Sequence, residues 1–376
     1  MKILHGLGIA LSLAVCMAQT GSADEVPAKT LKGVFARDFL IGAALNRDQF
    51  EGRDERAAAI VRAQFDTISP ENSMKWGPIH PKPGQYNFAD ADAYVAFGEA
   101  NRMVLIGHNL VWHQNTPDWV FKDDHGQPLS RDALLERLRD HIHTVVGRYK
   151  GRIKGWDVVN EALNLDGTMR ESPWYRIVGP DYVEKAFQYA HEADPAAELY
   201  YNDYSLELPA KRKGAVDLIK RLQAAGVPVA AVGLQSHDRL DWPKVEEADA
   251  TIRAFANLGI KVNITELDID VLPPIAPPDA EMVQTGNTDP KLDPYRGGLS
   301  DTVQQALAKR YSDLFAVYLR YPGIITRVTF WNVTDADSWL NRFPIMGRAN
   351  YPLLFDRQGR PKPAYEAVIK VGETAR

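Results

Sequence analysis

The sequence predicts an α/β fold, a (β/α)8 TIM barrel in a single domain, from three observations. Short apolar runs alternate with longer amphipathic segments, and buried runs flanked by helical segments are typical of βαβ units and a parallel sheet. There are eight such runs, which is the number of strands in a closed barrel of this type. Polar and aromatic residues follow nearly every run, where such a barrel gathers its functional groups.

The predicted strands extend over most of the chain. They are residues 39–45, 65–69, 104–109, 153–160, 198–203, 229–236, 262–268 and 325–333. The helical segments between them include residues 91–100, 134–148, 182–193, 211–225, 245–258 and 302–321, where apolar residues recur at helical spacing. An open doubly wound sheet is the alternative. Nucleotide-binding sheets of that kind often have a glycine-rich turn after the first strand, and residues 42–46 do not contain one.

Composition and charge narrow the class of protein. The chain has 376 residues, of which 45% are hydrophobic and 25% charged, as is usual for a soluble globular protein. A barrel domain uses about 250 residues or more, so the length is sufficient. The formal net charge of -5 argues against nucleic acid or a membrane as a partner, because both attract basic surfaces.

Residues 1–23 are expected to be a signal peptide, which leaves 24–376 as the barrel domain and predicts a secreted or periplasmic protein. Lys2 supplies the positive end, residues 7–17 the apolar stretch, and the small residues 21–23 a cleavage site before Asp24. The apolar stretch is too short to span a bilayer as a helix. A buried N-terminal helix is the alternative.

The single cysteine, Cys16, lies inside this leader. The mature chain would therefore have no disulfide or thiolate chemistry. Lipid attachment at Cys16 is the other possibility for the leader, but Val15 is bulkier than the small residue expected before an acylated cysteine.

Two stretches carry most of the chemistry. Residues 156–162 and 262–268 are apolar, β-branched runs that contain Glu161 and Glu266 among polar neighbours. A carboxylate at the end of a buried strand loses solvation, which raises its pKa unless a partner restores the charge. Two carboxyls in one cleft, one protonated and one ionised, are what cleavage of a glycosidic bond requires. The alternative is that both glutamates form salt bridges in the barrel core.

Neighbouring polar residues suit supporting roles. Asn160 lies beside the first glutamate and could hold a sugar hydroxyl. His237 and Asp268 could form a hydrogen-bonded pair that orients a nearby carboxylate and balances its charge. Two pairs of histidines, 141 with 143 and 108 with 113, suggest a metal site, but we expect none. Side chains two positions apart on a helix diverge, and the second pair is better explained by sugar contacts.

These motifs resemble those of family 10 glycoside hydrolases, the β-1,4-xylanases. Residues 156–161 resemble the acid/base signature of that family and residues 264–268 resemble its nucleophile signature. The resemblance extends over roughly residues 39–371. Further matches are residues 71–76, 107–108, 112–113, 202–204 and 233–237, and Trp331 with Thr334, Asp335 and Trp339.

The resemblance implies an endo-1,4-β-xylanase that retains anomeric configuration and acts on xylan and xylo-oligosaccharides without a cofactor. It implies Glu161 as general acid/base, Glu266 as nucleophile, Asn160 as a ligand of the sugar 2-hydroxyl, and His237 with Asp268 as support for Glu266. Further substrate-binding residues would be Glu71, Asn72, Lys75, His108, Trp112, Tyr204, Gln235, Trp331 and Trp339, all but Tyr204 on the non-reducing side of the cleaved bond. A barrel glycosidase for glucan or aryl glycosides is the alternative enzyme, and a non-catalytic sugar-binding barrel is the alternative outside the enzyme class.

Three features of the sequence leave open the preference among related sugar substrates. The family often has a glutamine where Asn115 stands, after Gln114, so a distal sugar contact either passes to Asn115 or is lost. Asn332 stands where a glycine is common. The proline-rich segment 272–299 follows the seventh run and should overhang the active face as a long loop. It either shapes the cleft or is a solvated insertion.

Overall fold

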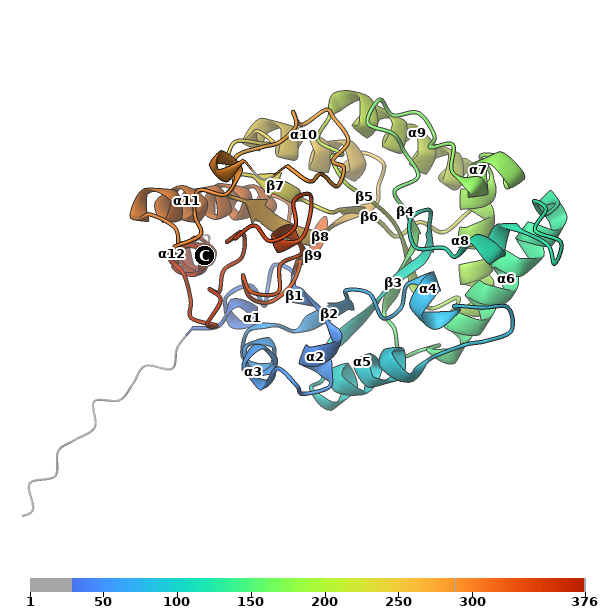
Figure 1. The fold of residues 1–376 in the computed structure, drawn as a ribbon, viewed down its shortest axis with the longest axis horizontal. Helices are drawn as coiled ribbons and strands as arrows, with labels where there is room; N and C mark the ends of the chain where they lie inside the picture. The colour runs from blue at the N-terminus through green and yellow to red at the C-terminus, as the bar shows by residue number, and fades with distance from the viewer. Residues whose placement is uncertain (1–28, 288, 375–376) are drawn as a thin grey trace, which may run out of the picture.

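The computed structural model describes residues 29–287 and 289–374, so the expected signal peptide lies outside the described residues. Nine parallel strands form one sheet in this part of the chain (Figure 1). They are β1 (Leu40–Leu45), β2 (Thr67–Pro70), β3 (Val104–Trp112), β4 (Gly155–Asn160), β5 (Glu198–Asp203), β6 (Ala231–Leu234), β7 (His237–Arg239), β8 (Lys261–Asp270) and β9 (Ile325–Phe330).

The sheet closes into a barrel. Each of the strands β1 to β5 pairs with the next strand along the chain, β6 pairs with β8, β8 with β9, and β9 with β1. The predicted (β/α)8 barrel is therefore confirmed. One predicted strand differs, because the run 229–236 ends early and the chain resumes as the short strand β7, which pairs with the last residues of β8. Ser236 separates the two pieces with a positive φ of 57°.

Helices surround the barrel (Figure 1). The six longer predicted segments correspond to α5, α6, α8, α9, α10 and α11, while α3 and α12 were not among them. The helices are α1 (Leu31–Val34), α2 (Arg47–Phe50), α3 (Glu55–Gln64), α4 (Trp76–Ile79), α5 (Ala89–Ala100), α6 (Arg131–Arg148), α7 (Pro173–Val178), α8 (Tyr182–Ala193), α9 (Pro209–Ala224), α10 (Val245–Ala256), α11 (Asp301–Tyr318) and α12 (Pro363–Thr374), with 3-10 turns η1 (Asp118–Phe121), η2 (Pro290–Leu292) and η3 (Trp339–Asn341).

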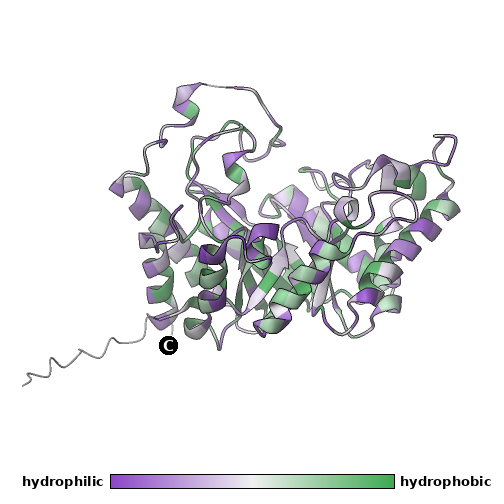
Figure 2. Cartoon of the chain, turned by 60° about the horizontal axis from the view of Figure 1, so that its bottom comes forward, coloured by the Kyte–Doolittle hydropathy of each residue, from purple (hydrophilic) through white to green (hydrophobic). Residues whose placement is uncertain are grey.

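Capping and amphipathic pattern explain the longer helices. Ser130 and Ser300 precede α6 and α11, and their side chains accept hydrogen bonds from the N–H groups of Ala133 and Val303, which satisfies donors that the helix leaves free. Hydrophilic and hydrophobic residues alternate along the surrounding helices (Figure 2), as expected when one helix face packs on the strands. In the described part of the chain, no helix has both the length and the apolar character of a membrane span.

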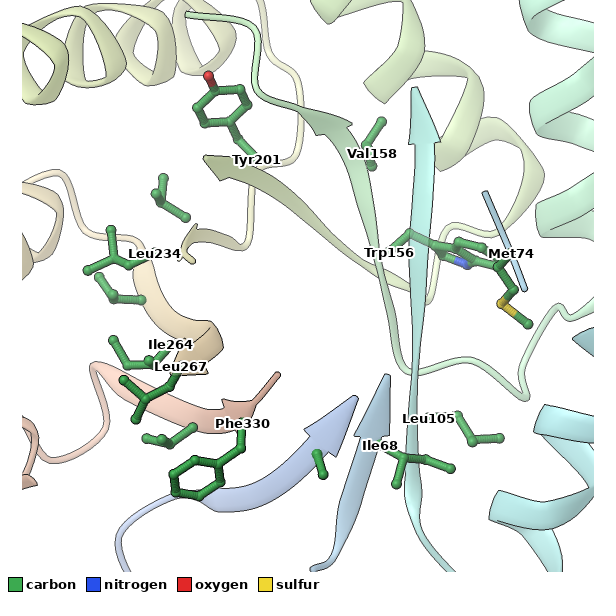
Figure 3. Packing of buried hydrophobic residues seen from close by; sticks show 14 of the residues in the cluster. Ile68, Met74, Leu105, Trp156, Val158, Tyr201, Leu234, Ile264, Leu267 and Phe330 are labelled. Carbon is green, nitrogen blue, oxygen red and sulfur yellow. The ribbon is translucent and has the colours of Figure 1, made fainter. Parts of the chain in front are cut away.

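Strand side chains and helix side chains share one apolar core. Ile68, Leu105, Ile264 and Phe330 are buried in the same cluster (Figure 3). Trp156 on β4 is buried as well, and a Cβ atom on Gly107 of β3 would lie 2.1 Å from its ring. Only glycine leaves room for the indole at this close approach. The core thus holds β3 and β4 together immediately before their polar ends.

Candidate active site

Unusual backbone conformations mark the carboxyl ends of the strands. Four non-glycine residues there have positive φ angles: Glu161 at 57°, Ser205 at 50°, Ser236 at 57° and Asn332 at 87°. Such conformations are unfavourable for most residues and cluster at functional sites. At this end of the barrel, the chain turns sharply after β4, β5, β6 and β9.

Glu161 lies at the end of β4 and is buried, with 8% of its surface exposed. The indole Nε1 of Trp112 donates a hydrogen bond to its Oε2 at 2.8 Å. The side-chain amides of Gln235 and Asn160 donate to its Oε1 at 3.1 and 3.3 Å. Neutral donors from β3, β4 and the β6 end therefore fix the Glu161 carboxyl.

Glu266 lies inside β8 and is buried. Its Oε1 accepts a hydrogen bond from Asn202 Nδ2 at 2.7 Å, and its Oε2 lies 3.3 Å from Nε2 of His237. Burial alone would raise the pKa of Glu266, but the hydrogen bonds from His237 and Asn202 and the positive charge of His237 hold that pKa below its usual value. Glu266 is thus kept as a carboxylate.

His237 supplies that charge. Its Nδ1 lies 3.0 Å from Asp268 Oδ1, and Asp268 also accepts a hydrogen bond from Trp339 Nε1 at 2.7 Å. Burial alone would lower the pKa of His237, but the negative charge of Asp268 and the hydrogen bonds to both carboxylates raise it to about 10. A protonated imidazole therefore lies between Asp268 and Glu266, while the donors to Glu161 are neutral.

Two amide side chains join the carboxyl groups. Asn202 donates both to Glu266 and, at 2.9 Å, to Oδ1 of Asn160, which itself contacts Glu161. Thr265 Oγ1 donates to Oδ1 of Asn202 at 2.6 Å and thereby orients the amide. A Cβ atom on Gly233 would lie 2.2 Å from the same oxygen, so glycine is required at this position. The network brings together side chains from β4, β5 and β8, beside the glycine of β6.

A cleft of about 380 Å³ opens over this network. Every substrate-binding residue that the sequence indicates lies along its wall, together with both glutamates, Asn160 and His237, while Asp268 lies behind His237. The lining residues are Glu71, Asn72, Lys75, His108, Trp112, Gln114, Asn160, Glu161, Tyr204, Ser205, Gln235, His237, Glu266, Glu281, Met282, Trp331, Trp339 and Phe343.

The wall after β2 is charged and buried. Lys75 Nζ donates to Asn72 Oδ1 at 2.9 Å and lies 4.9 Å from the centre of the Trp112 ring. Burial raises the pKa of Glu71 and lowers the pKa of Lys75, and the attraction between the two groups opposes both shifts. Asn332 donates to Glu71 Oε2 at 3.2 Å. These groups offer donors and acceptors to an uncharged polar ligand.

His108 and Trp331 extend this wall, and the centre of the Trp331 ring lies 5.9 Å from Lys75 Nζ. His108 Nδ1 lies 2.9 Å from Asp157 Oδ2, which fixes the ring orientation. The imidazole meets the Trp331 ring edge-to-face, with 5.4 Å between ring centres. Both side chains therefore present a defined surface to the cleft.

The structure shows which of Gln114 and Asn115 lies along the cleft. Gln114 lines the cleft, whereas the carbonyl oxygen of Asn115 accepts a hydrogen bond from the N–H of Gly77 outside it. The position of Asn332 is also explained. Its φ of 87° is in the region that glycine favours and asparagine tolerates, and its side chain adds the hydrogen bond to Glu71.

The proline-rich segment contributes to the cleft. Glu281 and Met282 from this segment line it, as do Ser205 and Phe343. None of these four was predicted from the sequence. Ser205 and Phe343 stand near predicted residues, but nothing in the local sequence distinguishes Glu281 from other acidic residues of a solvated loop.

The two histidines of α6, His141 and His143, have structural contacts. His141 is buried and stacks on Trp76 with 3.5 Å between ring centres, and its Nδ1 lies 3.2 Å from Nδ1 of His80. His143 Nε2 lies 3.2 Å from Glu192 at the surface. Among the described residues, no group of three or more potential ligands is placed to hold a metal ion.

Comparison with known proteins gives consistent relatives. The model of the family described as "Glycosyl hydrolase family 10" matches residues 30–371. Endo-1,4-beta-xylanase A of Xylanibacter ruminicola is 44% identical over 92% of this chain and 94% of its own length. Endo-1,4-beta-xylanase of Geobacillus stearothermophilus is 39% identical over 91% and 98%.

Solved structures agree in fold. A GH10 endoxylanase retrieved from a sugarcane soil metagenome superimposes with a TM-score of 0.87 at 45% identity, covering 91% of this chain and 99% of that chain. Xylanase XynB from Paenibacillus barcinonensis gives a TM-score of 0.82 at 37% identity, covering 92% and 99%.

Proposed function

The chain belongs to glycosyl hydrolase family 10, and on this premise we propose that it is an endo-1,4-β-xylanase that hydrolyses internal β-1,4 linkages of xylan with retention. One observation carries the proposal: two buried carboxyls, Glu161 and Glu266, face one cleft and are joined through Asn160 and Asn202. The charges and hydrogen-bond donors around these two carboxyls differ, as a double displacement requires.

In the first step, the ionised Glu266 attacks the anomeric carbon and forms a glycosyl ester. The bond to the departing oxygen breaks, and Glu161 gives its proton to that oxygen. His237 keeps Glu266 ionised before attack through its charge, and Asn160 holds the hydroxyl beside the reacting carbon.

In the second step, Glu161 is a carboxylate and accepts a proton from water. The water oxygen bonds to the anomeric carbon while the ester bond to Glu266 breaks, which releases the sugar and restores both carboxyls. Two inversions at the same carbon give net retention. Trp112, Asn160 and Gln235 can donate to Glu161 throughout, because they are neutral in both steps.

The cleft suits a neutral sugar chain. Aromatic rings of Trp112, Trp331 and Trp339 offer apolar faces for stacking, and amides and charged groups near them offer hydrogen bonds. Xylan and xylo-oligosaccharides are accordingly the proposed substrates.

Secretion to the periplasm or the medium is part of this proposal. Residues 1–23 would direct export and be cleaved before Asp24, as their charged, apolar and small-residue regions suggest. A polysaccharide too large to enter the cell requires such an enzyme outside it. N-terminal sequencing of the exported protein should therefore begin at Asp24.

Release of reducing sugar from xylan, cellulose and mannan in parallel tests the activity. We expect release from xylan to dominate. Proton NMR of the first product should show the β-anomer, because the proposal requires retention. Dominant release from cellulose or mannan would favour another barrel glycosidase, no release from any of them would indicate a sugar-binding barrel, and an α-anomer formed first would overturn the role of Glu266.

A further inference from the structure

The proline-rich loop 272–299 reaches the cleft through one short stretch. It connects β8 to α11, and Glu281 and Met282 are its contributions to the cleft wall. The residues that follow are held by the segment after η3: the N–H of Thr285 donates to the carbonyl oxygen of Pro344 at 2.8 Å. The loop therefore meets the cleft at a defined place.

Glu281 makes the polar contacts of this stretch with the opposite wall. The hydroxyl of Tyr204 lies 2.8 Å from Oε1 and 2.7 Å from Oε2 of Glu281. Arg170 Nη2 donates to Oε1 at 3.2 Å and also to the Tyr204 hydroxyl oxygen at 2.8 Å. The three side chains come from three different loops and their charges balance, so each restricts the other two.

Arg170 connects this cluster to the backbone around Glu161, the proposed acid/base. Its Nε donates to the carbonyl oxygen of Glu161 at 3.3 Å, and its Nη2 donates to the carbonyl oxygen of Leu163 at 3.2 Å. The N–H of Arg170 also donates to the carbonyl oxygen of Ala162 at 2.7 Å. The turn in which Glu161 adopts its positive φ is therefore attached to Glu281 through one arginine.

The position of Tyr204 shows on which side of the cleft the cluster of Glu281, Tyr204 and Arg170 lies. It follows β5, next to the β4 strand that carries Glu161, whereas Glu71 and Lys75 follow β2 on the far side of β3 and β4. Because Glu161 would protonate the departing oxygen, the leaving part of the substrate should extend toward Tyr204. The Lys211 ammonium lies 3.4 Å from the centre of the Tyr204 ring, so this ring is restrained at its face as well as at its hydroxyl.

We propose that Glu281 is a positioning residue for the leaving-group side of the cleft, where it fixes Tyr204 and Arg170 against the sugar units that depart. This inference rests on the proposed function, since it takes Glu161 as the acid. It assigns to the proline-rich loop a role in binding the reducing-end part of a β-1,4-linked chain.

The test compares Glu281→Ala with wild type on xylohexaose and on 4-nitrophenyl β-xylobioside. The hexaose places sugars on both sides of the cleaved bond, whereas the aryl glycoside leaves most of the leaving-group side empty. We expect kcat/KM for xylohexaose to fall by at least about fivefold, as for loss of one charged hydrogen bond at a half-exposed site. The value for the aryl xylobioside should change by less than about twofold.

Further variants test whether the effect of Glu281 comes from its hydrogen bonds, rather than from its charge or from a change in folding. Glu281→Gln retains an oxygen that can accept from Tyr204 and Arg170 and should recover most of the lost activity. Asp279→Ala changes an exposed acidic residue of the same loop and should leave both substrates unaffected. Tyr204→Phe should reproduce the pattern of Glu281→Ala, and the loss in the double variant should be smaller than the sum of the two single effects, because both substitutions remove the hydrogen bonds between Tyr204 and Glu281.

Two results would overturn the inference: equal losses on both substrates, or no loss on xylohexaose in a Glu281→Ala protein with the thermal transition of wild type. Failure of the proposed function would look different. In that case the wild-type enzyme would not cleave xylan, and the effect of Glu281 could still be measured on whichever β-1,4-oligosaccharide the enzyme does cleave.

Discussion

The charge beside each carboxyl distinguishes Glu161 from Glu266. Glu266 has a protonated imidazole within 3.3 Å, and this contact favours a permanently available carboxylate. Glu161 is held by indole and amide donors, which do not depend on a second titrating group. In the proposed mechanism, Glu161, which exchanges a proton in each step, is thus separated from Glu266, which must remain ionised until attack.

Replacing each glutamate by alanine should separate their roles. In Glu161→Ala, aryl xylosides with good leaving groups should still glycosylate the enzyme, because they need little protonation, while turnover of xylan should fall by at least about a hundredfold. In Glu266→Ala, both reactions should collapse, since no glycosyl ester can form. Burst kinetics on an activated aryl substrate, with parallel xylan assays, would measure both effects.

An exposed glutamate on α6 provides the control. Glu136→Ala removes a carboxyl outside the cleft and should leave both activities at the wild-type level. Equal losses on activated and natural substrates in the Glu161 and Glu266 variants would contradict the division of roles.

Residues of the cleft could be predicted from the sequence where they belong to a short local motif. Glu161, Glu266, His237 and Asp268 stand in short runs whose residue types already suggest the chemistry. Glu281 was not predictable, because its role depends on a loop that meets Tyr204 and Arg170 only in the folded chain. The sequence likewise could not tell which of Gln114 and Asn115 lines the cleft, since backbone geometry sets the direction of a side chain at a bend.

At the level of elements, buried strands were easier to predict than short helices. All eight apolar runs became strands because parallel strands are buried on both faces and appear as nearly continuous apolar sequences. The helix α3 was not among the predicted segments; with ten residues it is shorter than all six of the helices that were. The break between β6 and β7 arises from the positive φ of Ser236, which hydropathy does not reveal.

The short turn η3 after β9 should control the choice between xylose and glucose. Trp339 in this turn lies in the cleft, and a rigid wall there would oppose the hydroxymethyl group that glucose carries at C5. In Trp339→Ala, the ratio of kcat/KM for a xylobioside to that for a cellobioside should therefore narrow by about tenfold. Both absolute values should fall, because Trp339 also donates to Asp268. Steady-state kinetics on the two 4-nitrophenyl glycosides gives the ratio.

Trp339→Phe separates these two effects. The phenyl ring retains most of the wall but has no donor for Asp268, so both activities should fall while the ratio stays near wild type. If Trp339→Ala lowers both substrates by the same factor, Trp339 is only a stacking surface, and the selectivity must arise elsewhere, with Glu71 and Lys75 the next candidates.

On the scale of the whole molecule, the barrel makes one site from residues far apart in the sequence. Hydrogen bonds hold together Asn160 of β4, Asn202 of β5, Gln235 just after β6 and Glu266 of β8. These bonds give partners to polar groups that the closed barrel would otherwise bury without any. The closed sheet could be predicted from the number of runs. The pairing of these side chains could not, because it depends on strand register and on the turns after each strand.

The ion pair of His237 and Asp268, next to Glu266, should make folding stability depend on pH. The pKa of His237 rises from 6.5 to about 10 in the folded protein, so the folded state binds a proton more tightly than the unfolded chain. The resulting stabilisation is fully present below about pH 6.5 and is lost as the pH rises toward 10. Removing the imidazole in His237→Asn should therefore lower Tm most near pH 6, and the difference from wild type should shrink at pH 9 to 10.

His191→Asn is the matched control, because His191 is an exposed histidine on α8 and its loss should leave Tm close to wild type throughout this range. Buried carboxyls that do not contact His237 are common to wild type and variant and cancel in the difference, whereas Glu266 and Asp268 lose their charged partner in the variant and are part of the effect that is measured. Differential scanning calorimetry from pH 6 to 10 measures this difference directly. A Tm difference between wild type and His237→Asn that is equal at pH 6 and pH 10 would show that His237 stabilises the barrel by packing alone, and its charge could then not be what keeps Glu266 ionised.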